Sequence, residues 1–95
     1  SDLKNKFNLV ISDLAPNLTG ISSIDEENVF ELNLLTLEAA KRFLESNGIF
    51  IVKTFQNSNL KKFRKEMEKY LKIVQTAKPA ASKKQSKEIY LYGIK

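Results

Sequence analysis

Cysteine and histidine are both absent from this sequence of 95 residues. Without cysteine, the chain has no disulfide bonds, no thiolate chemistry and no cysteine-based metal site. Without histidine, it lacks the side chain that most often serves as a general base or metal ligand near neutral pH. Any acid–base chemistry must therefore fall to lysine, aspartate, glutamate or tyrosine.

Glycine and long apolar runs are also scarce. The three glycines, Gly20, Gly48 and Gly93, are too far apart to form a glycine-rich phosphate-binding loop. No apolar run approaches the roughly 20 residues that a membrane-spanning helix needs. The charged opening has no apolar stretch after it, so we expect no signal peptide. A hydrophobic content of 42% is typical of a folded protein, and the length predicts one small domain.

Positive charge is in excess. The chain carries 16 lysine and arginine residues against 11 aspartate and glutamate residues, a formal net charge of +5. Four of the lysines gather in the serine-containing stretch 78–87, which is expected to be a loop: Lys78, Lys83, Lys84 and Lys87. Lysines of this kind could hold the phosphates of a nucleic acid, or simply form a solvated surface. Charge alone leaves both interpretations open.

The hydrophobic pattern predicts the element order β-α-β-α-β-β. Strands are expected at residues 7–12, 49–55, 73–76 and 88–94. The strand at 49–55 has apolar residues at successive positions, which is typical of a parallel sheet covered on both faces. The first two strands are joined through a helix and should be parallel, whereas the last two are joined without one and should form an antiparallel hairpin.

Two amphipathic helices are expected between these strands. The first should run from about residue 23 to 45, opened by a capping box of Ser23 and Glu26 and stopped by Asn47-Gly48. Its apolar stripe is predicted to be Leu32, Leu35, Ala39 and Phe43. The second should start near Ser58, with the apolar face Leu60, Phe63, Met67, Tyr70 and Leu71.

Three charged residues are predicted to meet at one edge of the sheet. Asp13 follows the first strand, and Lys53 lies near the end of the second. If the last strand is antiparallel, Glu88 starts it at the same edge. Ligands of open α/β sheets bind beyond the carboxyl ends of the strands. A lysine flanked by two carboxylates at such an edge is a candidate acid–base site.

Each of these residues also has a purely structural interpretation. Lys53 could be a strand-end lysine whose amine reaches solvent, or a lysine whose pKa burial lowers enough for it to accept a proton. Asp13 could belong to a turn, and Glu88 could be a charge on an edge strand. The residues alone leave these alternatives open.

Three separated motifs make the sequence resemble the FtsJ-type RNA ribose 2′-O-methyltransferases. Residues 12–20 are similar to the family motif S-D-M/L-A-P-N-x-S/T-G, and residues 52–56 to V-K-x-F-Q. Residues 78–90 are similar to K-P-x-x-S-R/K-x-x-S-R/K-E-x-Y. The motifs occur in the family's order with similar spacing, and the resemblance covers about residues 7–94.

The resemblance implies an α/β fold, namely half of a Rossmann-like, S-adenosylmethionine-dependent methyltransferase sheet. The family's first catalytic lysine and its glycine-rich cofactor loop lie upstream of the first strand seen here. Residues 1–95 are therefore expected to form a single partial methyltransferase domain. The first strand would then expose an edge, which predicts dimerisation through it.

The resemblance also assigns roles to site residues. Asp13, Lys53 and Glu88 match the last three members of the family's K-D-K-E tetrad. It implies that Lys53 is the base that deprotonates a ribose 2′-hydroxyl, and that Glu88 positions the lysine or the ribose. Asp13 and Pro16 would contact S-adenosylmethionine.

For the substrate, the resemblance implies the ribose of a uridine in large-subunit (23S-type) ribosomal RNA. Lys78, Lys83, Lys84 and Lys87 would contact that RNA, and neither a metal ion nor a membrane is required. The expected location is the cytoplasm, or the mitochondrion in a eukaryote. A tRNA or an mRNA cap as substrate, and a non-catalytic RNA-binding or ribosome-assembly fragment, remain as alternatives.

Overall fold

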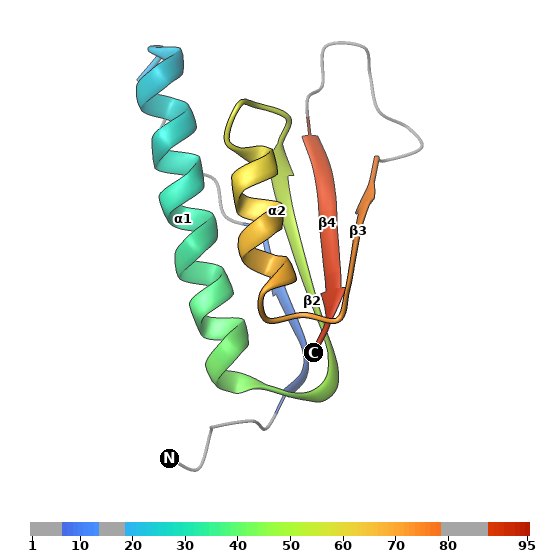
Figure 1. Cartoon of the computed structure of the whole chain (residues 1–95). Coiled ribbons are helices and arrows are strands. Elements are labelled where there is room, and N and C mark those ends of the chain that lie inside the picture. Colours follow the sequence, from blue (N-terminus) through green and yellow to red (C-terminus); the bar gives the residue numbers. More distant parts are fainter. Residues whose placement is uncertain (1–6, 14–18, 79–87) are drawn as a thin grey trace.

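The computed structural model describes residues 7–13, 19–78 and 88–95, and these form a four-stranded sheet with helices packed against it (Figure 1). The elements are β1 (Phe7–Ser12), α1 (Ser22–Phe43), β2 (Leu44–Phe55), α2 (Leu60–Glu68), β3 (Ile73–Ala77) and β4 (Glu88–Ile94). The predicted α/β class and the order β-α-β-α-β-β are confirmed.

The sheet has the strand order β1-β2-β4-β3. β1 is parallel to β2, while β4 is antiparallel to both β2 and β3, as predicted. In the β2–β4 register, Phe55 lies opposite Glu88 and Lys53 opposite Tyr90. The carboxyl ends of β1 and β2 and the amino end of β4 therefore lie at one edge, which we call the rim.

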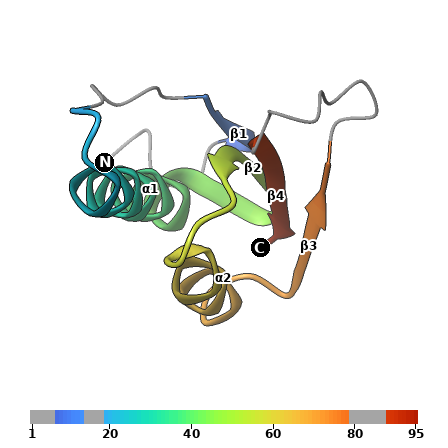
Figure 2. The same cartoon turned by 90° about the horizontal axis from the view of Figure 1, so that it is seen from above.

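Both helices pack on one face of the sheet, as the view from above shows (Figure 2). Successive residues of a strand point to opposite faces, so every second residue of β2 and β4 enters this side. These inward residues are all buried: Phe50, Val52, Thr54, Ile89, Leu91 and Gly93. The helices and their ends complete the core with Leu37, Ala40, Leu44, Phe63, Met67 and Leu71.

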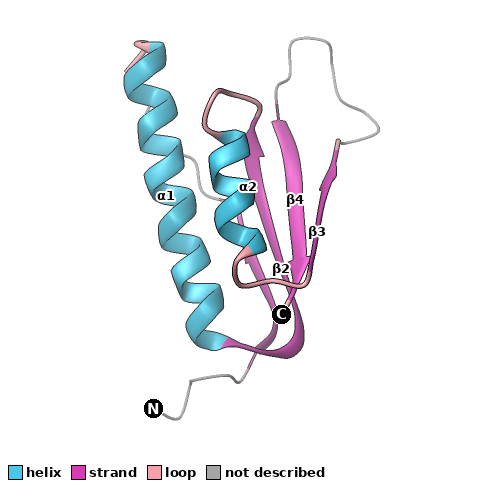
Figure 3. Cartoon of the chain, viewed as in Figure 1, coloured by secondary structure: helices cyan, strands magenta, loops and turns pink. Residues whose placement is uncertain are grey.

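The opposite face, which we call the open face, has no helix over it within the described residues (Figure 3). The prediction that both faces of the 49–55 strand are covered is therefore wrong for this part of the chain. The apolar side chains exposed there include Leu9, Ile11, Ile49, Tyr90 and Tyr92. The apolar run in β2 predicts the strand correctly, but it does not reveal that the helices of the described residues all lie on one side of the sheet.

Helix α1 presents a different stripe to the sheet from the predicted one. Leu35, predicted to be buried, is 67% exposed, whereas the buried residues are Val29, Asn33, Leu37 and Ala40. The predicted stripe contains apolar residues alone and therefore leaves out Asn33, which is 8% exposed. Its amide Nδ2 donates to Thr54 Oγ1 at 2.8 Å in the interior, so a polar residue occupies a core position.

The ends of α1 also differ from prediction. The capping box is wrong, because Ser23 makes no capping contact and the residue before the helix, Ile21, provides no side-chain cap. Instead the Asp25 carboxylate accepts hydrogen bonds from the N–H groups of Thr19 at 2.7 Å and Gly20 at 3.1 Å. The helix ends at Phe43, before the left-handed turn at Asn47, whose φ is 67°.

The second helix follows its predicted pattern more closely. Phe63, Met67 and Leu71 are buried, as the 3.6-residue period required. Tyr70 is the exception, because it lies exposed with the Lys41 ammonium 3.8 Å from its ring centroid. That arrangement is a cation–π contact between α1 and the end of α2.

Candidate functional site

Asp13, Lys53 and Glu88 meet at the rim, as the topology predicted. The ammonium Nζ of Lys53 lies 2.8 Å from Asp13 Oδ1 and 3.6 Å from Glu88 Oε2. The three residues come from the end of β1, the end of β2 and the start of β4, so the sheet itself brings them together. One positive and two negative charges thus form a cluster with a net charge of −1.

Lys53 points to the open face and remains 25% exposed. The hydrogen bond to the Asp13 carboxylate raises the pKa of Lys53 above its ordinary value, burial opposes the rise, and the charge of Glu88 adds to it. Of the two interpretations that the sequence leaves open for Lys53, a pKa lowered by burial does not hold in this structure. That interpretation assumed a strand covered on both faces, but the open face leaves too little burial to outweigh two carboxylates.

A buried hydrogen bond fixes the strand end that carries Lys53. Thr54, the next residue, points to the helical face and is 2% exposed, and its hydroxyl accepts the hydrogen bond from Asn33. Because α1 is joined to β2 at this point, the backbone on either side of Thr54 is held in place. Sequence reasoning missed Asn33. The available signal was its i, i+4 spacing between Val29 and Leu37.

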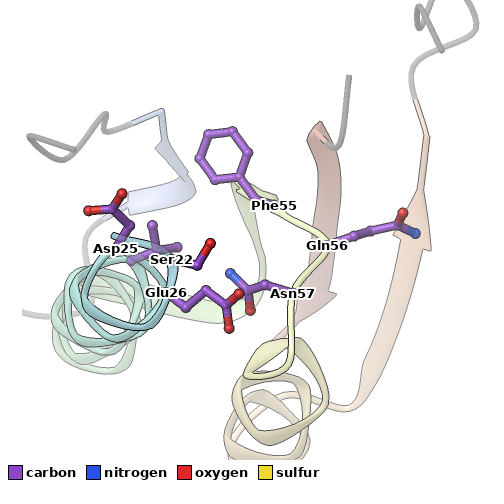
Figure 4. Close-up of a pocket in the computed structure, with 7 residues that line it drawn as sticks. Ser22, Asp25, Glu26, Phe55, Gln56 and Asn57 are labelled. Atoms are coloured by element: carbon purple, nitrogen blue, oxygen red, sulfur yellow. The ribbon is translucent and has the colours of Figure 1, made fainter. Parts of the chain in front are cut away.

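A cavity of about 190 Å³ lies beside the rim, between the first turns of α1 and the segment after β2 (Figure 4). It is lined by Ser22, Asp25, Glu26, Val29, Phe55, Gln56 and Asn57. Sequence reasoning missed this cavity, because it forms where two distant segments pack. No residue spacing in either segment indicates it.

Hydrogen bonds with the rest of the fold hold the polar walls of the cavity. Glu26 Oε1 accepts a hydrogen bond from Ser58 Oγ at 2.6 Å, and Asn57 Oδ1 accepts one from the N–H of Asn59 at 2.9 Å. The backbone N–H of Thr19 is the main cause that lowers the pKa of Asp25, so this carboxyl is charged at neutral pH.

The other predicted site residues lie mostly outside the described residues. This holds for Pro16, Lys83, Lys84 and Lys87. Lys78 is described and exposed, directly after β3 at the same end of the sheet as the rim. In the described part of the chain, no group of three or more acidic side chains could hold a metal ion. None of its helices is long and apolar enough to cross a membrane.

Known proteins resemble this chain in sequence and in fold. The sequence is 43% identical over 86 residues to ribosomal RNA large subunit methyltransferase E of Azoarcus sp., covering 90% of this chain and 42% of that protein. The protein of the same name from Chromobacterium violaceum is 46% identical over 87 residues, covering 92% and 42%. The crystal structure of a ribosomal RNA methyltransferase from Plasmodium falciparum superposes with a TM-score of 0.82 at 27% identity, covering 95% of this chain and 47% of that one.

The chain thus spans less than half the length of the relatives it matches. Within that span the match is continuous, because the profile of the FtsJ-like methyltransferase family covers residues 1–95. The α/β fold agrees with that of the Plasmodium protein. The chain belongs to the FtsJ-like methyltransferase family.

Proposed function

We propose that this protein transfers a methyl group from S-adenosylmethionine to a ribose 2′-hydroxyl in large-subunit ribosomal RNA. The observation that carries the proposal is the Lys53 ammonium held between Asp13 and Glu88 at the carboxyl ends of parallel strands. The names of the relatives support RNA of the large ribosomal subunit as the substrate. Such a substrate implies an enzyme of the cytoplasm.

Lys53 is the proposed general base. S-adenosylmethionine, held near Asp13, would supply the methyl group and keep the bonding pair on its sulfur, and the ribose 2′-oxygen beside Lys53 would accept that methyl group. The hydroxyl proton moves to the neutral amine of Lys53. A ribose hydroxyl is a poor nucleophile until a base takes its proton, and alignment of the reacting atoms supplies much of the rate.

Asp13 and Glu88 have positioning roles in this proposal. Glu88 lies across the lysine from Asp13, where it can orient the amine or a ribose hydroxyl. The Asp13 carboxylate is 63% exposed, which leaves it accessible to the methyl-donor end of a cofactor. We propose that Pro16, three residues after Asp13 in the sequence, also contributes to binding the cofactor.

The raised pKa of Lys53 sets a condition for this chemistry, because only the neutral amine can accept a proton. S-adenosylmethionine, when bound, supplies an electrophilic methyl group on a positively charged sulfur, and a positive charge near Lys53 favours its neutral form. Covering the open face with substrate would remove water from the amine and act in the same direction.

Two variants test the role of Lys53. Lys53→Ala removes the base and should lower ribose methylation by about 10²–10⁴-fold or more. Lys53→Arg keeps a cation for both carboxylates but cannot release its proton, so it should be about as inactive. Lys65→Ala, on the exposed surface of α2, is the matched control and should keep full activity. Retained methylation in Lys53→Arg would rule out the base and leave Lys53 as a positioning cation.

One alternative is a different function, in which the protein binds RNA without catalysing a reaction. Another keeps the methyl transfer but takes tRNA or an mRNA cap as the substrate. The net charge of −1 at the rim argues against a simple phosphate-binding site there. Isothermal titration with S-adenosylmethionine separates the two classes. Salt-sensitive RNA binding without any heat of cofactor binding would favour the binding module. Methylation of ribosomal RNA, tRNA and capped mRNA, compared in parallel, decides the substrate.

A further inference from the structure

The interior next to Lys53 holds a polar pair where apolar side chains would also fill the space. Asn33 of α1 is 8% exposed and Thr54 of β2 is 2% exposed, and Asn33 Nδ2 donates to Thr54 Oγ1 at 2.8 Å. Replacing both partners of a buried hydrogen bond by apolar groups of the same shape can leave stability unchanged or even raise it. Stability alone therefore does not explain why this pair is polar.

A hydrogen bond differs from an apolar contact in having a direction. Its strength falls steeply as the distance and angle depart from their best values, whereas apolar contacts have no preferred direction. The bond to Asn33 thus fixes where Thr54 lies relative to α1. Lys53 and Phe55 adjoin Thr54 in the strand and project to the other face of the sheet. The backbone that orients the Lys53 side chain is therefore fixed from the helical side.

Lys53 needs such a fixed backbone, because its two carboxylates come from other strands. Its Nζ lies 2.8 Å from Asp13 Oδ1 on β1's end and 3.6 Å from Glu88 Oε2 on β4. In the register with β4, Thr54 lies opposite Ile89, the residue after Glu88. A shift of β2 against either neighbour would lengthen one of the two distances. A misplacement of about 1 Å in an active site can lower the rate about 10²-fold.

Helix α1 also holds the segment that leads away from Asp13. The Asp25 carboxylate, about two helical turns before Asn33, accepts hydrogen bonds from the N–H groups of Thr19 at 2.7 Å and Gly20 at 3.1 Å. One helix thus contacts both the segment that follows Asp13 and the strand position next to Lys53. Through α1, the hydrogen bond of Asn33 ties the place of the lysine to that segment.

We infer that Asn33 and Thr54 are positioning residues, which hold Lys53 between Asp13 and Glu88 from the helical side of the sheet. This role rests on the proposed function where it concerns the rate of methyl transfer. Without the pair, the end of β2 can move and the distances to the two carboxylates become variable. The rate constant kcat then falls, whereas KM for RNA changes little, because both side chains are buried away from any substrate.

The double variant Asn33→Leu/Thr54→Val separates positioning from stability. It removes donor and acceptor together, so its melting temperature should stay close to that of the unsubstituted protein. Its kcat for ribose methylation should nevertheless fall about tenfold or more, with KM for RNA within about twofold. Thr54→Ser keeps the hydroxyl acceptor and should keep kcat within about twofold. An unchanged kcat in the double variant would overturn the inference.

Val74→Ala is the matched control for a loss of stability. Val74 is a core residue on β3, which lies at the opposite edge of the described sheet from β1. Its truncation should lower the melting temperature by about 5 °C or more and leave kcat unchanged at temperatures where the protein is folded. If Val74→Ala lowers kcat as much as the double variant does, weakened packing explains both and no positioning role is left.

A measurement without cofactor or RNA makes the inference independent of the proposed function. The hydrogen bond to Asp13 raises the pKa of Lys53, and the charge of Glu88 adds to the rise. In the double variant, this pKa should move toward the ordinary value of a lysine, because the carboxylates are held less closely. Titration of the Lys53 side chain by NMR measures it, with Lys53→Arg to identify the signal.

The two assignments can then fail separately. If the pKa of Lys53 moves in the double variant but Lys53→Ala still methylates RNA, the positioning role stands and the proposed base fails. If Lys53→Ala abolishes methylation while the double variant keeps both its kcat and the pKa of Lys53, the proposed function stands and the positioning role fails.

Discussion

The two faces of the sheet differ in what their residues contribute. On the helical face, Phe50, Val52 and Thr54 of β2 are buried. On the open face, the alternating residues Ile49 and Lys53 remain accessible. Neighbouring residues of one strand therefore serve two purposes: one set holds the fold together, and the other carries the charged cluster at the rim.

This division suggests where substitutions affect stability and where they affect chemistry. A buried side chain loses its transfer free energy and leaves a cavity when it is truncated. A side chain on the open face is already in contact with water in the described structure. Paired substitutions at adjacent positions of β2 can therefore measure the difference between the faces.

The largest difference in the free energy of unfolding is expected between the variants Phe50→Ala and Ile51→Ala. Phe50 is fully buried, so its truncation should lower the free energy of unfolding by about 3–5 kcal/mol. Ile51 is its neighbour on the open face, and truncation of Ile51 should lower the free energy of unfolding by about 1 kcal/mol. Urea denaturation monitored by circular dichroism gives both values. Equal losses would mean that something covers the open face in solution.

The next effect comes from the polar contact inside the core. Asn33→Leu should lower stability by about 1–3 kcal/mol, because the buried Thr54 hydroxyl then lacks its partner. Adding Thr54→Val removes that hydroxyl and should restore much of the loss. If the double variant is no more stable than Asn33→Leu alone, the hydrogen bond is not what stabilises this junction.

The sequence predicted those parts of the fold in which apolar residues are buried and polar residues are exposed. The strand positions and the face of α2 obey simple periodicity, and the convergence of Asp13, Lys53 and Glu88 followed from strand direction. The stripe of α1 was predicted wrongly because Asn33 is polar and buried. A rule that equates polar with exposed cannot find such a residue.

Two features of the site depend on contacts between distant segments. The pKa of Lys53 is set by carboxylates that precede and follow it by dozens of residues, and by an open face that no local pattern reveals. The cavity lies between the start of α1 and the segment after β2, and a hydrogen bond between Glu26 and Ser58, 32 residues apart in sequence, joins these two segments. Sequence reasoning assigned Glu26 to a helix cap, which is a local contact, and so overlooked both the partner and the cavity.

A smaller effect is the pH dependence of the rate. Because the pKa of Lys53 is raised, the neutral amine is a minor form at neutral pH, and methylation should rise about tenfold per pH unit until that pKa is approached. The free energy of unfolding changes with pH in the opposite direction. The ion pairs of Lys53 contribute fully below pH 10.5, the ordinary pKa of a lysine, and this contribution is lost as the pH rises through the raised pKa of Lys53 in the folded protein. Single-turnover rates at increasing pH measure the first trend. A flat profile would mean that Lys53 works as a cation.

The smallest change in stability is expected on the open face of β1, where an effect on association should appear instead. Ile11 is 61% exposed on a strand that lies at the edge of the described sheet, and an exposed apolar edge favours pairing with a second chain. Ile11→Lys should change the free energy of unfolding by no more than about 0.5 kcal/mol. It should nevertheless reduce dimerisation, measured by sedimentation velocity over a range of protein concentrations.

Leu35→Lys is the matched control for Ile11→Lys, because Leu35 is a similarly exposed apolar residue on the outer side of α1. Both variants add one positive charge, so a general effect of charge on solubility would appear equally in both. Only an effect confined to Ile11→Lys assigns the association to the sheet. If neither variant changes the sedimentation of the protein, the open face is stable in water without a partner, and its apolar side chains are then available to the substrate that approaches Lys53.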